Sequence, residues 1–197
     1  DLRGNFGIIQ GAATLLDFAN SDDERAQMLG VLQRNLKQGT QLLTEMLDMA
    51  RLEAGQEELH ITSFDVADLL QELAESVQPL AGERNLWLYV DGDVTLVVEN
   101  DAVKIRRIAQ NLLLNAIKYT EAGGVTINWK VDADYWWLTV GDTGPGLPES
   151  TRLKSGEGIG LIIVRQLCEL MTCQLYVDSR AGEGTQISLK FPQRYSS

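Results

Sequence analysis

The chain has 197 residues, of which 44% are hydrophobic and 23% are charged, and its formal net charge is −11. This composition excludes a disordered chain and allows one large globular domain or two small ones. The acidic excess disfavours a nucleic-acid partner, because no basic stripe is available to neutralise phosphates.

The sequence also bears on location. No apolar stretch reaches the ~20 residues needed to span a bilayer, and no signal peptide is visible, so we expect no membrane contact within this chain. Cys168 and Cys173 make neither a disulfide framework nor a metal-ligand cluster. We therefore expect a reducing, cytoplasmic location.

Residues 1–54 predict two helices joined by the polar segment NSDDE at 20–24, where Ser21 or Asp22 can cap the second helix. Gly55 is well placed to end that helix. Apolar residues recur three and four positions apart, which is typical of the seam of a coiled coil or helical bundle. The seam residues are Leu2, Phe6, Ile9, Ala13 and Leu16 in the first helix, and Leu29, Leu32, Leu36, Gly39, Leu43, Met46 and Ala50 in the second.

A two-helix hairpin cannot bury this seam alone. We predict that an antiparallel hairpin over residues 1–54 dimerises into a four-helix bundle. The alternative, a hairpin packed against its own C-terminal domain, would favour a broader apolar face. The first helix should have about 18 residues and the second about 30, so we expect the first to continue upstream of Asp1.

From residue 59 onward the pattern changes to alternating strands and helices. We expect a short strand, a helix capped by Ser63 or Asp65, and then helices segregated against a mixed sheet. The further strands are expected at 86–93, 94–99, 125–131, 135–142, 174–179 and 185–191, and the further helices at 101–119 and 158–171. Packing within the sheet is expected for Trp87, Trp129, Trp136 and Trp137. The predicted fold class is α+β: a helical hairpin over 1–54, then an α/β sandwich over 59–197.

The segment NLLLNAIKYT at 111–120 places Asn111 and Asn115 four residues apart on one helical face, with Lys118 one turn later. Amide oxygens are hard neutral ligands that suit Mg²⁺, which completes its shell with waters and substrate phosphates. The Lys118 ammonium can meet a phosphate as a point charge. The alternative is an amphipathic core helix with exposed amides.

The segment DTGPG at 142–146 puts Asp142 at the end of an apolar strand, before a turn built on Gly144 and Gly146. A fixed carboxylate at this point can accept a hydrogen bond from the exocyclic amine of adenine. Guanine offers no donor in the same place, so the carboxylate favours adenine.

The segment GEGIGL at 156–161 contains Gly156, Gly158 and Gly160, which let backbone N–H groups approach phosphates at the start of a helix. Alone, such a run could equally be a plain turn. The ordered set of three segments, with GEGT at 182–185 near the end of the chain, indicates a site for ATP and Mg²⁺ instead.

In this order the segments resemble the N, G1, G2 and terminal glycine boxes of sensor histidine kinases. These kinases share an ATPase superfamily with type II topoisomerases, mismatch-repair ATPases and heat-shock chaperones. The resemblance covers almost the whole chain, and Asp101 with Lys104 and Arg106 fits the usual approach to the N box. It implies that Asn115 coordinates Mg²⁺, with Asn111 beside it as a nucleotide-binding and catalytic residue.

The resemblance also implies nucleotide-binding roles for Lys118, Tyr119, Asp142, Gly144, Gly146, Gly156, Gly158, Gly160, Leu161 and Thr185. Within this set, Asp142 would bind N6 of adenine and Thr185 would support the adenine side.

In the resembled family a phosphoaccepting histidine opens a box written roughly His-Glu/Asp-Leu-Arg-Thr-Pro-Leu. This chain begins DLRGNF, so the acceptor is expected immediately before Asp1 and is absent from the sequence. Asp1 would orient that imidazole and take its proton as a general base. His60, the one histidine in the chain, is expected to be a polar residue at a strand edge.

Three features depart from the family pattern. Gly4 replaces the usual Thr, whose hydroxyl positions water for dephosphorylation, so phosphatase activity is in doubt. Asn5 replaces the usual proline, and whether it positions that water instead is an open hypothesis. The segment LPESTRLKS at 147–155 is short for the family's lid and lacks phenylalanine, so either the lid is short or residues are omitted.

The resemblance implies ATP-dependent phosphorylation of a histidine on the hairpin, then transfer to an aspartate on a response-regulator receiver domain. The expected protein is a homodimer in the cytoplasm, either alone or as the cytoplasmic part of a larger sensor protein. One alternative is a non-enzymatic phosphotransfer or scaffold protein with a decayed ATP site, which the intact boxes disfavour. Another is a different superfamily member, such as a serine kinase or conformational ATPase, which the seam hairpin disfavours.

Overall fold

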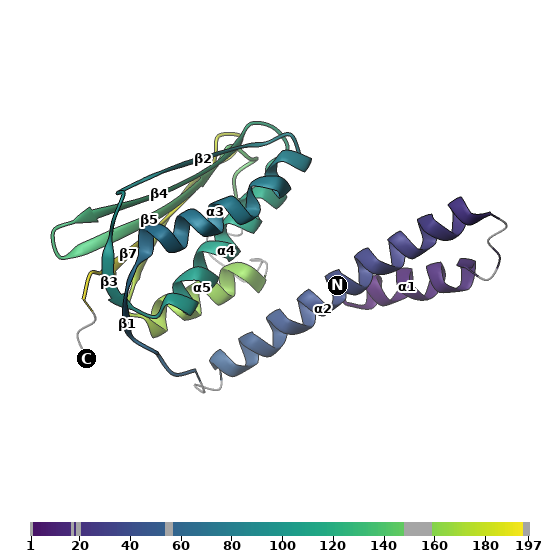
Figure 1. Cartoon of the computed structure of the whole chain (residues 1–197), viewed down its shortest axis with the longest axis horizontal. Coiled ribbons are helices and arrows are strands. Elements are labelled where there is room, and N and C mark those ends of the chain that lie inside the picture. The colour runs from purple at the N-terminus through teal and green to yellow at the C-terminus, as the bar shows by residue number, and fades with distance from the viewer. Residues whose placement is uncertain (1, 17, 19–20, 54–56, 148–158, 195–197) are drawn as a thin grey trace. The chain divides into compact units, whose positions relative to one another are not determined.

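The computed structural model describes residues 2–16, 18, 21–53, 57–147 and 159–194. The chain divides into two compact units, Asp1–Ala54 and Gly55–Ser197 (Figure 1). Within the described part of the chain, no helix is long and apolar enough to cross a membrane.

The first unit consists of helices α1 (Leu2–Leu16) and α2 (Asp22–Glu53), which pack against each other. Ser21 caps α2, since its Oγ accepts the Glu24 N–H at 3.2 Å, and acidic residues in the first turn favour the helix dipole. The first helix has 15 residues, fewer than predicted, because the Phe18 N–H turns back to the Leu15 carbonyl at 3.1 Å. Gly55, the predicted end signal of α2, lies outside the described residues.

Large apolar side chains remain exposed along the predicted seam of this hairpin. The exposed fraction is 54% for Phe6, 52% for Leu36 and 50% for Met46, whereas Gly39 is buried. A single copy of the hairpin therefore leaves much of its apolar seam uncovered.

The second unit alternates strands and helices, as predicted from the sequence. Its elements are β1 (Thr62–Asp65), α3 (Val66–Glu83), β2 (Trp87–Gly92), β3 (Val97–Asn100), α4 (Ala102–Tyr119), β4 (Gly124–Asp132), β5 (Tyr135–Asp142), α5 (Ile159–Leu170), β6 (Gln174–Arg180) and β7 (Gly184–Pro192).

The strands form two sheets. The larger has the order β2-β4-β5-β7-β6, in which β2 and β4 run parallel and every other pair is antiparallel. This confirms the predicted α+β class with a mixed sheet. Strands β1 and β3 form a separate antiparallel pair, and β3 is shorter than predicted, because the Leu96 N–H before it donates to Asp65 Oδ1 at 2.9 Å.

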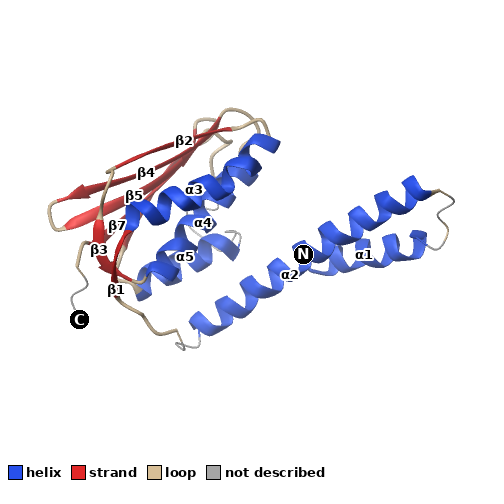
Figure 2. Cartoon of the chain, viewed as in Figure 1, coloured by secondary structure: helices blue, strands red, loops and turns tan. Residues whose placement is uncertain are grey.

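Helices α3, α4 and α5 cover one face of the larger sheet (Figure 2). Trp136 of β5 is fully buried on that face and stacks on Phe191 of β7, with ring centroids 4.6 Å apart. Trp129 is also buried there. Trp87 and Trp137 alternate to the opposite face, where Trp87 is 49% exposed and Trp137 lies 5.5 Å from the ring of Tyr176. All four tryptophans therefore pack on the sheet, two on each face.

Two aspartates fix the helix starts. Asp65 caps α3 by accepting the Ala67 N–H at 2.9 Å, which selects it over Ser63. Asp101 caps α4 through the Lys104 N–H at 3.1 Å, and its other oxygen accepts the N–H of the exposed His60 at 2.9 Å. These bonds hold the start of α4 in place against the segment before β1.

Candidate functional site

The two asparagines of α4 meet the first turn of α5. A Cβ atom added at Gly160 would lie 3.0 Å from Asn115 Nδ2 and 3.1 Å from Asn111 Oδ1. These distances are tighter than ordinary packing, so a side chain at position 160 would press on both amides. Three of the predicted site residues, from two separate sequence segments, are thus brought together.

The orientation of the Asn111 amide follows from its hydrogen bond. Asn111 Nδ2 donates to the Arg107 carbonyl at 2.8 Å, one turn earlier on α4. The amide oxygen is therefore the atom that faces Gly160. The Asn115 amide makes no hydrogen bond to any described residue, so its oxygen is also available. Together the two amides can supply neutral oxygen ligands to a hard cation such as Mg²⁺.

Asp142, the last residue of β5, is held by two backbone donors. Its Oδ1 accepts the Gly144 N–H at 2.8 Å and the Thr185 N–H at 3.3 Å. Burial raises the pKa of the Asp142 carboxyl above its ordinary value of 3.8, and the two backbone hydrogen bonds oppose this rise. With Oδ1 occupied by backbone donors, Oδ2 is the oxygen left to accept a ligand donor.

The end of α4 lies beside this carboxylate. A Cβ atom added at Gly144 would lie 2.9 Å from Asp142 Oδ1, 3.2 Å from the Tyr119 carbonyl oxygen and 3.4 Å from Thr120 Oγ1. Gly146, with φ of +76°, then turns the chain toward the Arg180 carbonyl, a conformation that favours glycine. The row Asn111, Asn115, Tyr119 along α4 thus ends next to the Asp142 turn.

Ser179, which the sequence analysis did not identify, ties this turn to Thr185. Ser179 Oγ accepts the Leu147 N–H at 2.8 Å, and it lies 3.0 Å from Thr185 Oγ1 and 3.2 Å from the Gly184 carbonyl oxygen. Both hydroxyl residues are buried. The sequence alone gives no signal for this pair, because the register that makes Ser179 and Thr185 cross-strand partners in β6 and β7 is seen only in the structure.

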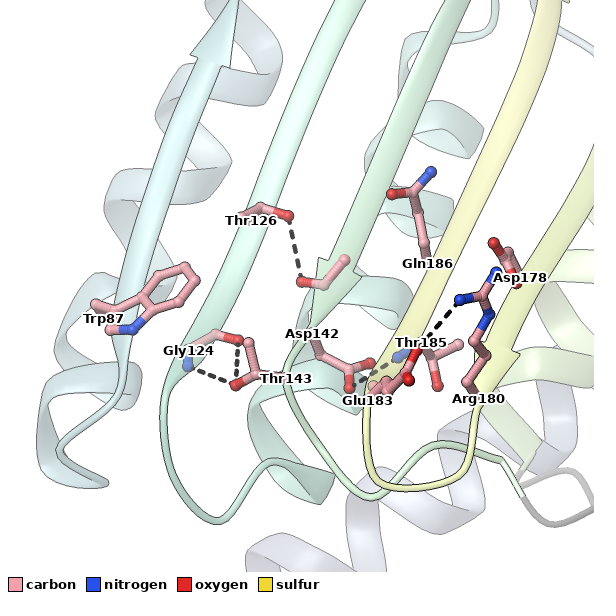
Figure 3. Close-up of a pocket in the computed structure, with 12 residues that line it drawn as sticks. Trp87, Gly124, Thr126, Asp142, Thr143, Asp178, Arg180, Glu183, Thr185 and Gln186 are labelled. Atoms are coloured by element: carbon pink, nitrogen blue, oxygen red, sulfur yellow. Dashed lines mark hydrogen bonds and ion pairs between the residues drawn. The ribbon is translucent and has the colours of Figure 1, made fainter.

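A cavity of about 350 Å³ opens at the end of the sheet that carries Asp142 (Figure 3). Asp142 and Thr185 line it, with Trp87 of β2 on one side and Arg180 of β6 on the other. Its lining comes from the strands and their turns, and α4 contributes none of it. The described residues therefore form two groups: the α4 amides with Gly160, and the Asp142 carboxylate with Thr185.

Residues 100–195 match the family described as histidine kinase-, DNA gyrase B-, and HSP90-like ATPase. The chain is 29% identical, over 98% of its own length, to the autoinducer 2 sensor kinase/phosphatase LuxQ of Vibrio cholerae serotype O1. These matches support a histidine-kinase ATP-binding catalytic domain. The aligned region is 25% of LuxQ, so the chain spans about a quarter of that relative.

Solved structures agree with this assignment. Full-length ShkA in complex with AMPPNP is similar with a TM-score of 0.77 and 26% identity, covering 99% of this chain and 44% of ShkA. Histidine kinase ThkA in complex with response regulator protein TrrA has a TM-score of 0.79 and 22% identity, covering 98% of this chain and 58% of the ThkA chain, and shows the fold alone.

Of the remaining predicted site residues, some lie on α4 and α5 and the others fall outside the described residues. Lys118 and Tyr119 are exposed on the last turn of α4, and Lys118 Nζ lies 5.0 Å from the Tyr119 ring centroid. Leu161 is half-buried in the first turn of α5. The predicted Asp1, Gly156, Gly158 and all of the lid segment after Leu147 lie outside the described residues.

Proposed function

We propose that this chain is the core of a histidine kinase that binds Mg-ATP and phosphorylates a histidine on the helical hairpin. The phosphoryl group would then pass to an aspartate on a response-regulator receiver domain. The observation that carries the proposal is the meeting of Asn111 and Asn115 with Gly160. Two amides and a helix start converge there, within a region that matches the kinase ATPase family.

The donor set fits Mg²⁺ bound through a nucleotide. As the family resemblance implies, Asn115 would be the ligand and Asn111 its neighbour. The hydrogen bond of Asn111 turns its amide oxygen toward the α5 start as well. Neutral amide oxygens suit a cation that takes its remaining ligands from phosphates and water. The bound cation would supply charge neutralisation for phosphoryl transfer.

Asp142 would recognise the adenine base. Its free Oδ2 can accept the exocyclic amine, while the backbone donors on Oδ1 keep the carboxylate in one orientation. Thr185 would support the adenine side, and Lys118 and Tyr119 would line the nucleotide. Gly144, Gly146 and Leu161, with Gly156 and Gly158, would complete the nucleotide cradle.

Catalysis in this proposal comes from positioning and electrostatics, as in other phosphoryl transfers. The exposed Lys118 ammonium would screen phosphate charge. Asp1 would act as the general base that takes the proton of the acceptor histidine. Gly4, exposed in α1, carries no hydroxyl to position a hydrolytic water, so we expect weak phosphatase activity.

The exposed apolar seam of the hairpin supports homodimerisation through residues 1–54, with two hairpins forming a four-helix bundle. A receiver domain is the expected partner, since the similar ThkA was solved with a response regulator. A cytoplasmic location follows from this activity, either alone or as part of a larger sensor protein.

The test is a phosphotransfer assay on a polypeptide extended upstream of Asp1. With Mg-ATP we expect labelled protein whose phosphate is acid-labile and alkali-stable, as phosphohistidine is. Calorimetric titration of the same protein should show Mg-ATP binding and no comparable Mg-GTP binding. Binding of neither nucleotide would indicate a scaffold with a decayed site. An acid-stable phosphoprotein would indicate a serine kinase, and ATP hydrolysis without labelling a conformational ATPase.

A further inference from the structure

The two cysteines of the chain meet at the C-terminal end of α5. Cys168 lies in the last turns of the helix, and Cys173 lies just before β6. We propose that Cys168 and Cys173 form a thiol pair that closes reversibly to an intramolecular disulfide when it meets a small-molecule disulfide oxidant. This modification site is independent of the proposed kinase activity.

The backbone brings the two residues together. The Cys173 N–H donates to the Cys168 carbonyl at 2.9 Å, and the Thr172 N–H donates to the Glu169 carbonyl at 3.2 Å. Thr172 has φ of +55°, in the left-handed region. These bonds define a Schellman motif, which ends a helix by placing the side chains of exactly these two positions, three before the cap and two after it, in contact.

The two cysteine side chains are placed for a disulfide bond. The Cys173 thiol lies near enough to the Cys168 thiol for that group to act on its pKa. Disulfides require Cα atoms roughly 4.4–6.8 Å apart and Cβ atoms that face each other. The direct backbone hydrogen bond between the two residues, and the nearness of their thiols, favour both conditions. In most Schellman motifs this contact is made by two apolar side chains, whereas here both partners can be oxidised.

The two thiols differ in access. Cys168 is buried, at 3% exposure, whereas Cys173 is only half-buried. Cys173 is therefore the sulfur that an external oxidant reaches first, and Cys168 is placed to resolve the product.

The contact also sets the pH dependence. The hydrogen bond to Cys168, then burial, raises the pKa of the Cys173 thiol above its usual range. Among the described residues, Cys168 is the titratable group that acts on Cys173. Because the thiolate is the nucleophile, oxidation is slow near neutral pH and accelerates as the pH rises.

The reaction balances without further reagents. The Cys173 thiolate attacks one sulfur of RSSR, which forms the Cys173–S–S–R bond and releases RS⁻. The Cys168 thiolate then attacks the Cys173 sulfur, which forms the Cys168–Cys173 bond and releases the second RS⁻. The two protein thiols lose two protons and two electrons, and the oxidant leaves as two RSH molecules.

The experiment incubates the native chain with oxidised glutathione at pH 7 and pH 9 and follows the intact mass. We expect wild type to lose two hydrogen masses, faster at pH 9, with no accumulation of glutathione adduct, and dithiothreitol should reverse the change. Cys168→Ser should instead accumulate one glutathione adduct on Cys173. Cys173→Ser should react more slowly than Cys168→Ser, because its remaining thiol is buried.

A second arm repeats the reaction in urea. Unfolding removes the Schellman contact, so the mixed disulfide should then accumulate in wild type before it resolves. Wild type that carries adducts on both cysteines in the native state, or that loses mass only by forming covalent dimers, would overturn the proposal. Equal accumulation of the mixed disulfide with and without urea would overturn it as well.

Discussion

The two units bury their apolar side chains in different ways. In Gly55–Ser197 three helices cover one sheet face, and Ile108, Trp136 and Phe191 are fully buried. In Asp1–Ala54 the predicted seam residues Phe6 and Leu36 are about half exposed. At about 25 cal/mol per Å² of apolar area, an uncovered seam forgoes a large stabilisation. The second unit therefore has a hydrophobic core of its own. The first unit has an exposed apolar surface that would be stabilised by packing against another surface.

This comparison separates the effects expected from substitutions. Changes at the nucleotide site should alter binding by the second unit and leave assembly intact. Changes on the hairpin seam should weaken assembly and leave nucleotide binding intact.

The largest effect is expected from Asn115→Ala. Removing the amide takes away the proposed side-chain oxygen ligand of Mg²⁺, so Mg-ATP affinity should fall at least ~100-fold in calorimetric titration. The control is Gln110→Ala, an exposed residue on the same helix, which should bind as wild type does. Undiminished ATP binding by Asn115→Ala would show that the site assignment is wrong.

Leu36→Glu should break the first unit's assembly. A charge in the centre of a dimer seam would be desolvated without a partner, so the dimer dissociation constant should rise by about 100-fold or more in sedimentation equilibrium. Mg-ATP affinity should stay unchanged. Gln33→Glu, which adds the same charge at an exposed polar position of α2, is the matched control. A wild-type chain that sediments as a monomer would favour a hairpin covered within its own chain.

Asp142→Asn should weaken the binding of ATP and stabilise the fold. The amide can turn a donor toward the adenine amine, so affinity should fall roughly 10-fold. Burial raises the carboxyl pKa above 3.8 in the folded state. The protonated group's stabilising effect is present below the unfolded pKa and is lost as pH rises through the folded pKa. At neutral pH the ionised Asp142 therefore costs stability, which asparagine removes.

The pH dependence tests the predicted direction of both effects, the one on stability and the one on ATP affinity. The thermal midpoint of Asp142→Asn should exceed that of wild type at pH 7, and the difference should shrink as the pH falls. Wild-type ATP affinity should drop on acidification through the raised pKa by more than the affinity of the variant does. Parallel profiles would mean that this carboxylate does not meet the nucleotide.

Much of the second unit's fold followed from local sequence signals. The β4–β5 hairpin, the Asp65 cap of α3 and the extent of α4 could be predicted from alternation, capping and helical periodicity, which act over a few residues. The separation of β1 and β3 into their own sheet could not be predicted in this way, because strand partners are determined by long-range packing. The shortening of β3 depended on Asp65, 31 residues away, binding the Leu96 N–H.

The site shows the same division. The spacing of Asn111 and Asn115 on one helix face could be predicted, but their contact with Gly160 arises from the packing of α5 on α4. Ser179 was missed because a lone serine in a strand carries no pattern. The role of Ser179 follows from its pairing with Thr185 across the strands and from the hydrogen bond that it accepts from the Leu147 N–H.

The smallest effect is expected from Ser179→Ala, which removes that hydroxyl without removing any proposed ligand. The Leu147 N–H would lose its acceptor and Thr185 Oγ1 would lose its buried partner, so the turn after Asp142 would be held less firmly. Mg-ATP affinity should fall only ~3–10-fold. Ser188→Ala, which breaks the Thr139–Ser188 hydroxyl pair on the opposite sheet face, is the control and should leave affinity unchanged. If both variants lower the affinity for Mg-ATP equally, Ser179 acts through general stability and not through the Asp142 turn.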